Sequence, residues 1–137
     1  MKIYDKNLFK VEKDIDIKTY DIDFAGHVNN IVYIRWLEDL RLLWLAKFLP
    51  LDELSKNNLF PVIRSTNIEY KRQLKMFDRL HALTYLSKLE RDLIWTLRTE
   101  FRSENKIVAI AEQKGVAFNL KNNKMVGLPE TMINLDK

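Results

Sequence analysis

The chain has 137 residues, of which 47% are hydrophobic, and a formal net charge of +4. This length supports one hydrophobic core, so the sequence predicts a single domain, and the lack of cysteine excludes disulfides, thiolate nucleophiles and cysteine-ligated zinc. No stretch reaches the roughly 20 apolar residues of a membrane span, and the first residues lack the apolar core of a signal peptide, so we expect a cytoplasmic protein without a membrane partner. Because basic and acidic residues are interleaved, we also expect no nucleic-acid partner.

A half-buried strand is the first element that the sequence predicts. Between Phe9 and Thr19, apolar residues alternate with Lys and Asp, which is the two-residue period of a strand with one face in the core. The polar stretch that follows, Tyr20 to Asn30, contains Gly26 and ends in an Asn pair of the kind that caps helices. We therefore expect a loop there and a helix directly after it.

A long and mostly buried helix is predicted from Ile31 to Leu49. Its apolar residues recur every three or four positions and leave only a narrow polar stripe, and Pro50 then ends the helix. Two pairs on that stripe have ion-pair spacing and are expected at the solvent edge, Arg35 with Asp39 and Glu38 with Arg41.

Four further strands are expected to follow the helix and to pair antiparallel. The two-residue period covers residues 60–74, 80–89, 93–102 and 107–120. The segments between them are predicted to be a linker over 51–58, a hairpin turn over 103–106, and a tail over 121–137 with a short terminal element. A long helix wrapped by a curved antiparallel sheet of about five strands is an α+β domain. Its free edge strand invites a second copy, so we expect a homodimer or homotetramer.

The residues that suggest chemistry concentrate in Tyr20–Tyr33, which reads YDIDFAGHVNNIVY. This segment resembles the signature of the 4-hydroxybenzoyl-CoA thioesterase and acyl-ACP thioesterase branches of the hotdog-fold superfamily. Glu69–Tyr70, Phe77–Asp78 and Gly127–Pro129 are similar to later landmarks of that family. The resemblance implies one hotdog thioesterase domain over residues 1–137. It also implies hydrolysis of an acyl-CoA or acyl-ACP in fatty acid metabolism, with no cofactor and no metal.

Asp23 is the residue to which the resemblance assigns catalysis, as a nucleophile or as a general base on water. The backbone amides from Gly26 to Asn29, at the positive end of the following helix, would hold the oxyanion. From the residues alone, a cap of the turn is the commoner role for Asp23. Asp21 is expected to hold the loop through backbone hydrogen bonds.

His27 has two interpretations. In the plant-type acyl-ACP thioesterases that the segment resembles, an Asp, an Asn and a His act together, but Ala25 stands here in place of the Asn. His27 therefore either polarises the thioester carbonyl or the attacking water, or is a structural residue of the loop. The residues predicted to bind the substrate are Gly26, Val28, Asn29, Asn30, Tyr33, Glu69 and Arg72.

Some of these residues have a structural alternative. Asn29 and Asn30 are commoner as helix caps than as catalysts, and Tyr33 is most simply a core aromatic whose hydroxyl reaches the pocket. The aromatic residues that either line an acyl tunnel between helix and sheet or pack in the core are Trp36, Trp44 and Trp95.

Charged residues in and after the second predicted strand, residues 60–74, also have two interpretations. Glu69 is either a second acid at the site across a dimer interface or the ion-pair partner of Lys71. Arg72, together with Lys71, Lys75 and Arg79, is expected to meet the phosphates of coenzyme A or the acidic surface of a carrier protein, although a solvated turn explains these residues almost as well.

Two alternatives to a thioesterase stay open. The first is a hotdog protein that binds acyl thioesters without turnover, although the carboxylate of Asp23 is present. The second is a hotdog hydratase or dehydratase. The signature of that branch is an Asp followed by an Asn-Pro step and then a His. This sequence differs from it, because no Pro lies between Asp23 and His27.

Overall fold

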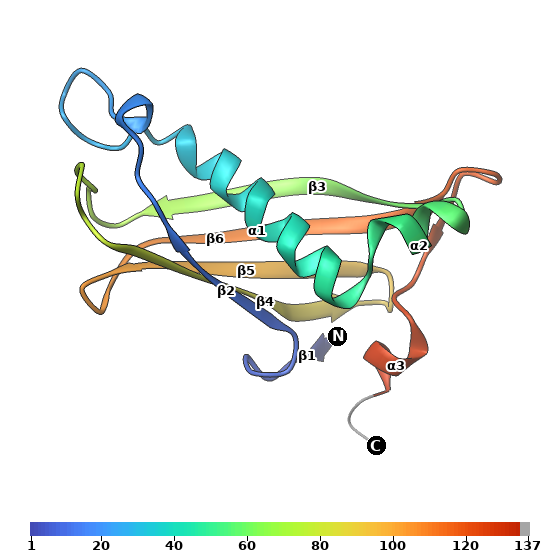
Figure 1. Ribbon diagram of the computed structural model, residues 1–137. Helices are drawn as coiled ribbons and strands as arrows, with labels where there is room; N and C mark the ends of the chain where they lie inside the picture. The colour runs from blue at the N-terminus through green and yellow to red at the C-terminus, as the bar shows by residue number, and fades with distance from the viewer. Residues whose placement is uncertain (135–137) are drawn as a thin grey trace.

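One antiparallel sheet of seven strands curves around a long helix in the computed structural model, which describes residues 1–134 (Figure 1). The strands are β1 (Lys2–Ile3), β2 (Lys10–Ile15), β3 (Leu59–Tyr70), β4 (Leu80–Glu90), β5 (Ile94–Ser103), β6 (Lys106–Asn119) and β7 (Lys124–Val126). The helical elements are the 3₁₀ turn η1 (Thr19–Asp21), α1 (Val32–Phe48), α2 (Leu51–Lys56) and α3 (Glu130–Ile133). This arrangement confirms the predicted α+β hotdog fold.

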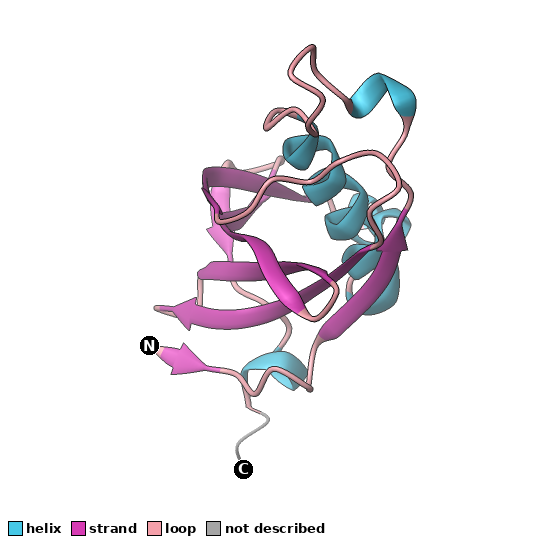
Figure 2. Ribbon diagram, turned by 90° about the vertical axis from the view of Figure 1, so that its left-hand side faces the viewer, coloured by secondary structure: helices cyan, strands magenta, loops and turns pink. Residues whose placement is uncertain are grey.

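The strand order explains how the sheet encloses the helix. The order is β1-β4-β5-β6-β3, with β2 also paired to β4 and β7 to β6, and every pairing is antiparallel. Figure 2 shows the sheet bending around one side of α1. All five predicted strands are present, and β1 and β7 raise the count because elements of two and three residues are too short to show a period.

Helix α1 follows the prediction closely, since it starts and ends within a residue of the expected bounds. Its buried face consists of Val32, Tyr33, Trp36, Leu37, Leu40, Trp44 and Leu45. Pro50 separates it from α2, a six-residue helix within the expected linker that carries Asp52 and Glu53 in its first turn. Acidic side chains favour a helix N-terminus, but six residues are too few for a periodic pattern. None of the described helices is long and apolar enough to cross a membrane.

Two apolar clusters form the core between α1 and the sheet. The first lies under the N-terminal half of α1, where Phe101 is fully buried and its ring meets those of Tyr33 and Trp36. The second lies under the C-terminal half and includes Trp44 and Trp95. The two halves of the helix therefore cover different sets of side chains.

A layer of polar side chains lies where the two clusters meet. The hydroxyls of Thr84 and Thr99, on neighbouring strands, are 2.7 Å apart and buried. The Arg41 guanidinium on α1 donates to Gln113 Oε1 at 3.0 Å, and Gln113 Nε2 donates to Thr66 Oγ1 at 3.0 Å. Because these groups satisfy one another, polar atoms can lie inside the fold at little cost. We call Arg41, Gln113, Thr66, Thr84 and Thr99 the polar layer.

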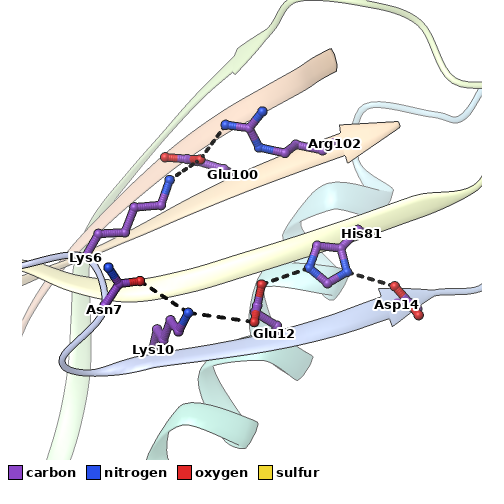
Figure 3. A network of polar contacts seen from close by, with 8 residues as sticks. All are labelled: Lys6, Asn7, Lys10, Glu12, Asp14, His81, Glu100 and Arg102. Carbon is purple, nitrogen blue, oxygen red and sulfur yellow. Dashed lines mark hydrogen bonds and ion pairs between the residues drawn. The ribbon is translucent and has the colours of Figure 1, made fainter. Parts of the chain in front are cut away.

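The outer face of the sheet is held to the N-terminal segment by charged contacts, as Figure 3 shows. Lys6 Nζ lies 2.9 Å from the carboxylate of Glu100, whose side chain is largely buried. The ring of His81 on β4 lies 2.8 Å from Asp14 and 3.2 Å from Glu12, both on β2. The His81 contacts reinforce the pairing of β2 with β4, and the Lys6 contact holds the segment before β2 to β5.

Candidate functional site

The loop that precedes α1 is a narrow antiparallel turn. Ile22 and Val28 form an isolated bridge, and the amide of Asp23 donates to the carbonyl of His27 at 2.8 Å. Gly26, at the tip, has φ +85° and donates to the Asp23 carbonyl at 3.0 Å. That backbone conformation suits glycine because a side chain would be strained there. The sequence therefore folds this segment into a rigid turn that presents Asp23 and His27 at its base.

The carboxylate of Asp23 is fixed by the turn itself. Its Oδ1 accepts hydrogen bonds from the amides of Ala25 at 3.0 Å and His27 at 3.3 Å, which is the capping role that the sequence left open. Its Oδ2 receives no hydrogen bond from any described residue. One oxygen thus orients the group and the other is available to a ligand.

Asp21 anchors the base of the loop, as predicted. Its side chain is buried, and it accepts hydrogen bonds from the amide of Lys18 at 2.9 Å and from Arg35 at 3.1 Å. Its carbonyl accepts the amide of Asn29 at 2.9 Å. The expected pair of Arg35 with Asp39 is therefore wrong, because Arg35 reaches across to the loop that carries the motif.

The end of β3 forms the opposite wall of the site. The Tyr70 hydroxyl donates to the carbonyl of Asn30 at 3.1 Å, and the amide of Val28 donates to the carbonyl of Leu74 at 2.7 Å. Together the two segments enclose an open depression of about 470 Å³. Its lining residues are Asp23, Ala25, His27, Val28, Asn29, Asn30, Tyr33, Tyr70, Lys71, Arg72, Gln73 and Leu74.

The backbone amides of the loop are mostly occupied, contrary to the sequence-based expectation. The donors of Gly26, His27, Val28 and Asn29 are all used inside the protein. The first turn of α1 is satisfied as well, since Ile31 donates to the Asn29 side chain and the next three amides donate to carbonyls three residues earlier. In the depression's lining, the amide of Asn30 has no acceptor among the described residues. The amides of Gln73 and Leu74, in the opposite wall, have no acceptor among the described residues either, so Asn30 is the free backbone donor among the lining residues of the loop.

Tyr33 occupies the floor of the depression. Its side chain is buried, and its ring packs edge-on against Tyr70 at 5.2 Å and Phe101 at 5.0 Å. Burial, followed by the neighbouring Tyr70, raises the pKa of the Tyr33 hydroxyl. The hydroxyl therefore stays protonated and can donate a hydrogen bond.

Two of the predicted binding residues do not line the depression. Gly26 shapes the turn without lining it. Glu69 lies in a separate hollow with Arg98 and Glu112, and its carboxylate is 3.4 Å from Lys71 Nζ. Successive residues of a strand face opposite sides of the sheet, so Glu69 points away when Tyr70 points toward the site. The structure thus contains the ion pair that was the alternative interpretation of Glu69.

Four lining residues were not assigned to the site from the sequence, namely Ala25, Tyr70, Gln73 and Leu74. Tyr70 is the one that the sequence could have revealed. It was noted only as a landmark of the β3 segment, although its alternation with Glu69 was sufficient to place it on the other face. Gln73 and Leu74 gave no signal, because they belong to the loop after β3. Among residues 1–134, no cluster of three His, Asp or Glu side chains could hold a metal ion.

Comparison with known proteins gives consistent matches over most of the chain. The family model of the thioesterase-like superfamily matches residues 17–134. The chain is 27% identical over 119 residues to the long-chain acyl-CoA thioesterase FadM of Escherichia coli (strain K12), covering 86% of this chain and 90% of FadM. It is similar to the solved structure of YbaW, a probable thioesterase from Escherichia coli, with TM-score 0.79 and 26% identity over 88% of this chain and 92% of that one. Slr0204, a 1,4-dihydroxy-2-naphthoyl-CoA thioesterase from Synechocystis, shares the fold, with TM-score 0.79 and 18% identity over 93% of this chain and 98% of that one.

Proposed function

Because the chain belongs to the thioesterase-like superfamily, we propose that it is a thioester hydrolase that converts an acyl-CoA to a free carboxylic acid and coenzyme A. One observation carries this proposal: Asp23, which has a free carboxylate oxygen, and Asn30, which has a free amide, line the same depression. A thioester carbonyl held there has a base or nucleophile beside it and a donor for the charge that develops on its oxygen. The likeness to a long-chain acyl-CoA thioesterase supports acyl-CoA as the substrate class.

Asp23 is the proposed catalytic group. As a general base, its Oδ2 takes a proton from water while the water oxygen attacks the carbonyl carbon, and the carbon–sulfur bond then breaks to release the thiolate. As a nucleophile, the same oxygen attacks the carbon directly and the carbon–sulfur bond breaks to expel the thiolate, after which water cleaves the resulting anhydride and regenerates the carboxylate. In both routes the Asn30 amide donates to the oxyanion, so this proposal moves that role from the amides of residues 26–29.

The His27 side chain is proposed to contact the substrate and not to have a structural role in the loop. Its backbone is part of the turn, but its ring makes no hydrogen bond with any described residue and lines the depression. A ring nitrogen in that position can donate to the thioester carbonyl or orient the attacking water. Tyr33 supplies a second neutral donor at the floor of the site.

Arg72 and Lys71 are proposed to bind the phosphates of coenzyme A. Both line the depression, and the guanidinium of Arg72 has no carboxylate within ion-pair distance in the described part of the chain. A carrier protein with an acidic surface could meet the same two cations, so acyl-ACP is the alternative substrate.

A homodimer is the proposed functional unit. Strand β3 has twelve residues and, within residues 1–134, pairs with β6 alone, so one of its edges carries unpaired backbone donors and acceptors. An antiparallel pairing with β3 of a second copy would satisfy them and extend the sheet. Sedimentation or light scattering on the purified protein tests this assembly. The proposed location of the protein is the cytoplasm.

The decisive experiment is thiol release from a panel of acyl-CoAs of different chain length. Asp23→Asn keeps the size and the capping oxygen but removes the base, so kcat should fall by about 10²–10⁴-fold. The matched control is Asp16→Asn, which removes an exposed carboxylate outside the depression and should leave kcat unchanged.

Three outcomes would contradict the proposal. Full activity in Asp23→Asn would remove Asp23 from catalysis. No thiol release from any acyl-CoA or acyl-ACP would favour a binding protein. A change in enoyl absorbance without thiol release would indicate a hydratase.

A further inference from the structure

A second hollow lies at the opposite end of α1 from the candidate site. It encloses about 350 Å³ between the C-terminal half of α1, α2, the sheet and the segment that leads into α3. Figure 1 shows α2 and α3 at this end of the molecule, and the loop before α1 at the other end. Trp44, Leu45, Leu54, Trp95, Leu97 and Leu128 are among its walls. Its volume lies in the range of small-molecule sites. We call it the apolar cavity.

The apolar cavity is not a continuation of the candidate site within one copy of the chain. Arg41 and Gln113, which belong to the polar layer, connect α1 to β6, and Gln113 continues the contact to Thr66 on β3. On the other side of this row, Tyr33 packs against Tyr70. Helix α1 has 17 residues, so its two ends are about 25 Å apart. A ligand in the cavity therefore needs its own recognition.

Two charged side chains of the described part of the chain line the apolar cavity, and they differ in burial. Arg41, a member of the polar layer, is on one wall, and its side chain is only 16% exposed. Glu130 is exposed, in the first turn of α3. The cavity thus has a largely buried cation on one wall and an exposed anion on another, so an amphiphile with an anionic head would be attracted toward Arg41.

The guanidinium of Arg41 has donors to spare. It carries five N–H groups, and its contacts are to Gln113 and to the carboxylate of Glu38. The Glu38 side chain is 55% exposed, so it can leave the guanidinium for water at small cost. A planar carboxylate can then take its place, because it matches the fork of the guanidinium.

We propose that the apolar cavity binds a straight-chain monocarboxylic acid, with the carboxylate on Arg41 and the alkyl chain between Trp44 and Trp95. The inference does not rest on the proposed catalysis, because it uses none of the residues of the Asp23 depression. Thioester hydrolysis nevertheless releases acids of this class. The fraction of occupied cavities would therefore rise as the product accumulates.

The experiment uses brominated ligands and the fluorescence of the protein's tryptophans. A bromine atom quenches an indole that it contacts, and two of the three tryptophans line the cavity. We expect saturable quenching by 11-bromoundecanoate. The matched neutral probe, 11-bromoundecan-1-ol, should bind about tenfold more weakly, since a charge-assisted pair is lost.

Variants locate the ligand. Ala117→Phe fills the cavity and should abolish quenching, whereas Ala46→Phe, at an exposed position of α1, should not. Arg41→Met should weaken the binding of bromoundecanoate about tenfold and leave the affinity for the alcohol unchanged. Lys47→Met, which removes a cation of the same helix, should alter neither affinity.

The outcomes separate the two sites. Retained quenching in Asp23→Asn, together with its loss in Ala117→Phe, supports the proposal. Equal affinity for acid and alcohol, or unchanged affinity in Arg41→Met, overturns carboxylate recognition. Loss in Asp23→Asn with retention in Ala117→Phe overturns the location. Melting curves check that each variant is folded, and Arg41→Lys, which keeps the charge, should retain the preference for the acid if Arg41→Met does not fold.

Discussion

Replacing Thr84 by valine removes one half of a buried hydrogen bond in the polar layer. Thr84 and Thr99 are each 2% exposed, and their hydroxyl oxygens are 2.7 Å apart. Valine has nearly the shape of threonine, so the substitution leaves no large void. The remaining hydroxyl loses its partner in a place that water does not reach. A buried polar group without a partner costs about 1–3 kcal/mol, so each single valine should lower the unfolding free energy by that amount.

The double variant makes this prediction sharp. Thr84→Val with Thr99→Val removes both hydroxyls, so no orphan remains, and its stability should return to within about 1 kcal/mol of the unmodified chain. Urea unfolding of the four proteins gives the coupling energy directly. If the two single losses simply add in the double variant, the hydroxyls do not stabilise each other and the account of the polar layer is wrong.

Two further substitutions probe the sheet. Gly115→Ala should destabilise the fold by about 1–3 kcal/mol in thermal melts, because a methyl group there would overlap the ring of Trp95; a neutral result would mean that Trp95 can move aside. His81→Gln tests a pH dependence, since hydrogen bonds to Asp14 and then Glu12 raise the pKa of His81 in the folded state. The stabilisation by His81 should be fully present below about pH 6.5 and should be lost as the pH rises through the raised pKa. The unfolding free energies of the unmodified chain and of His81→Gln, measured in low-salt buffer, should therefore converge at alkaline pH. A constant difference between them across that range would contradict the prediction.

Most of the architecture was predictable because long elements carry a clear period. Trp95, Leu97, Thr99 and Phe101 alternate with polar residues, and β5 places these four among the buried residues of the core side. Helix α1 was found for the same reason. By contrast, β7 has three residues, so the pairing of Ala117 with Val126 gave no local signal. Such short elements form because a neighbouring strand offers partners.

Side-chain partners were predicted less well than elements, and Arg41 shows why. Its spacing from Glu38 gave the correct ion pair but predicted a solvent-edge position. In the structure its second partner is Gln113, which lies 72 residues away in sequence. Only the sheet's curvature brings β6 under that face of α1. Helical spacing describes neighbours on one element, and it is silent about the element across from it.

In the candidate site, too, the sequence predicted residues that are neighbours in one segment but not their hydrogen-bond partners in the fold. The motif identified Asp23, His27 and Asn30 as neighbours because they are close in sequence and belong to one loop. The identity of the free donor could not be read from the sequence, since each amide between Gly26 and Asn29 could in principle face a ligand. In the folded chain all four of these amides have acceptors, and among the lining residues of the loop the free amide is that of Asn30. A hydrogen-bond inventory therefore changes the proposed mechanism even where the motif was correct.

The two apolar clusters and the polar layer between them also have a consequence for function. Side chains under the N-terminal half of α1 support the Asp23 depression, whereas those under the C-terminal half form the apolar cavity. Because close-packed residues couple to their neighbours and distant ones act nearly independently, substitutions in one cluster should change one of these sites and leave the other's geometry intact. The cavity can therefore vary in size without disturbing the turn that fixes Asp23.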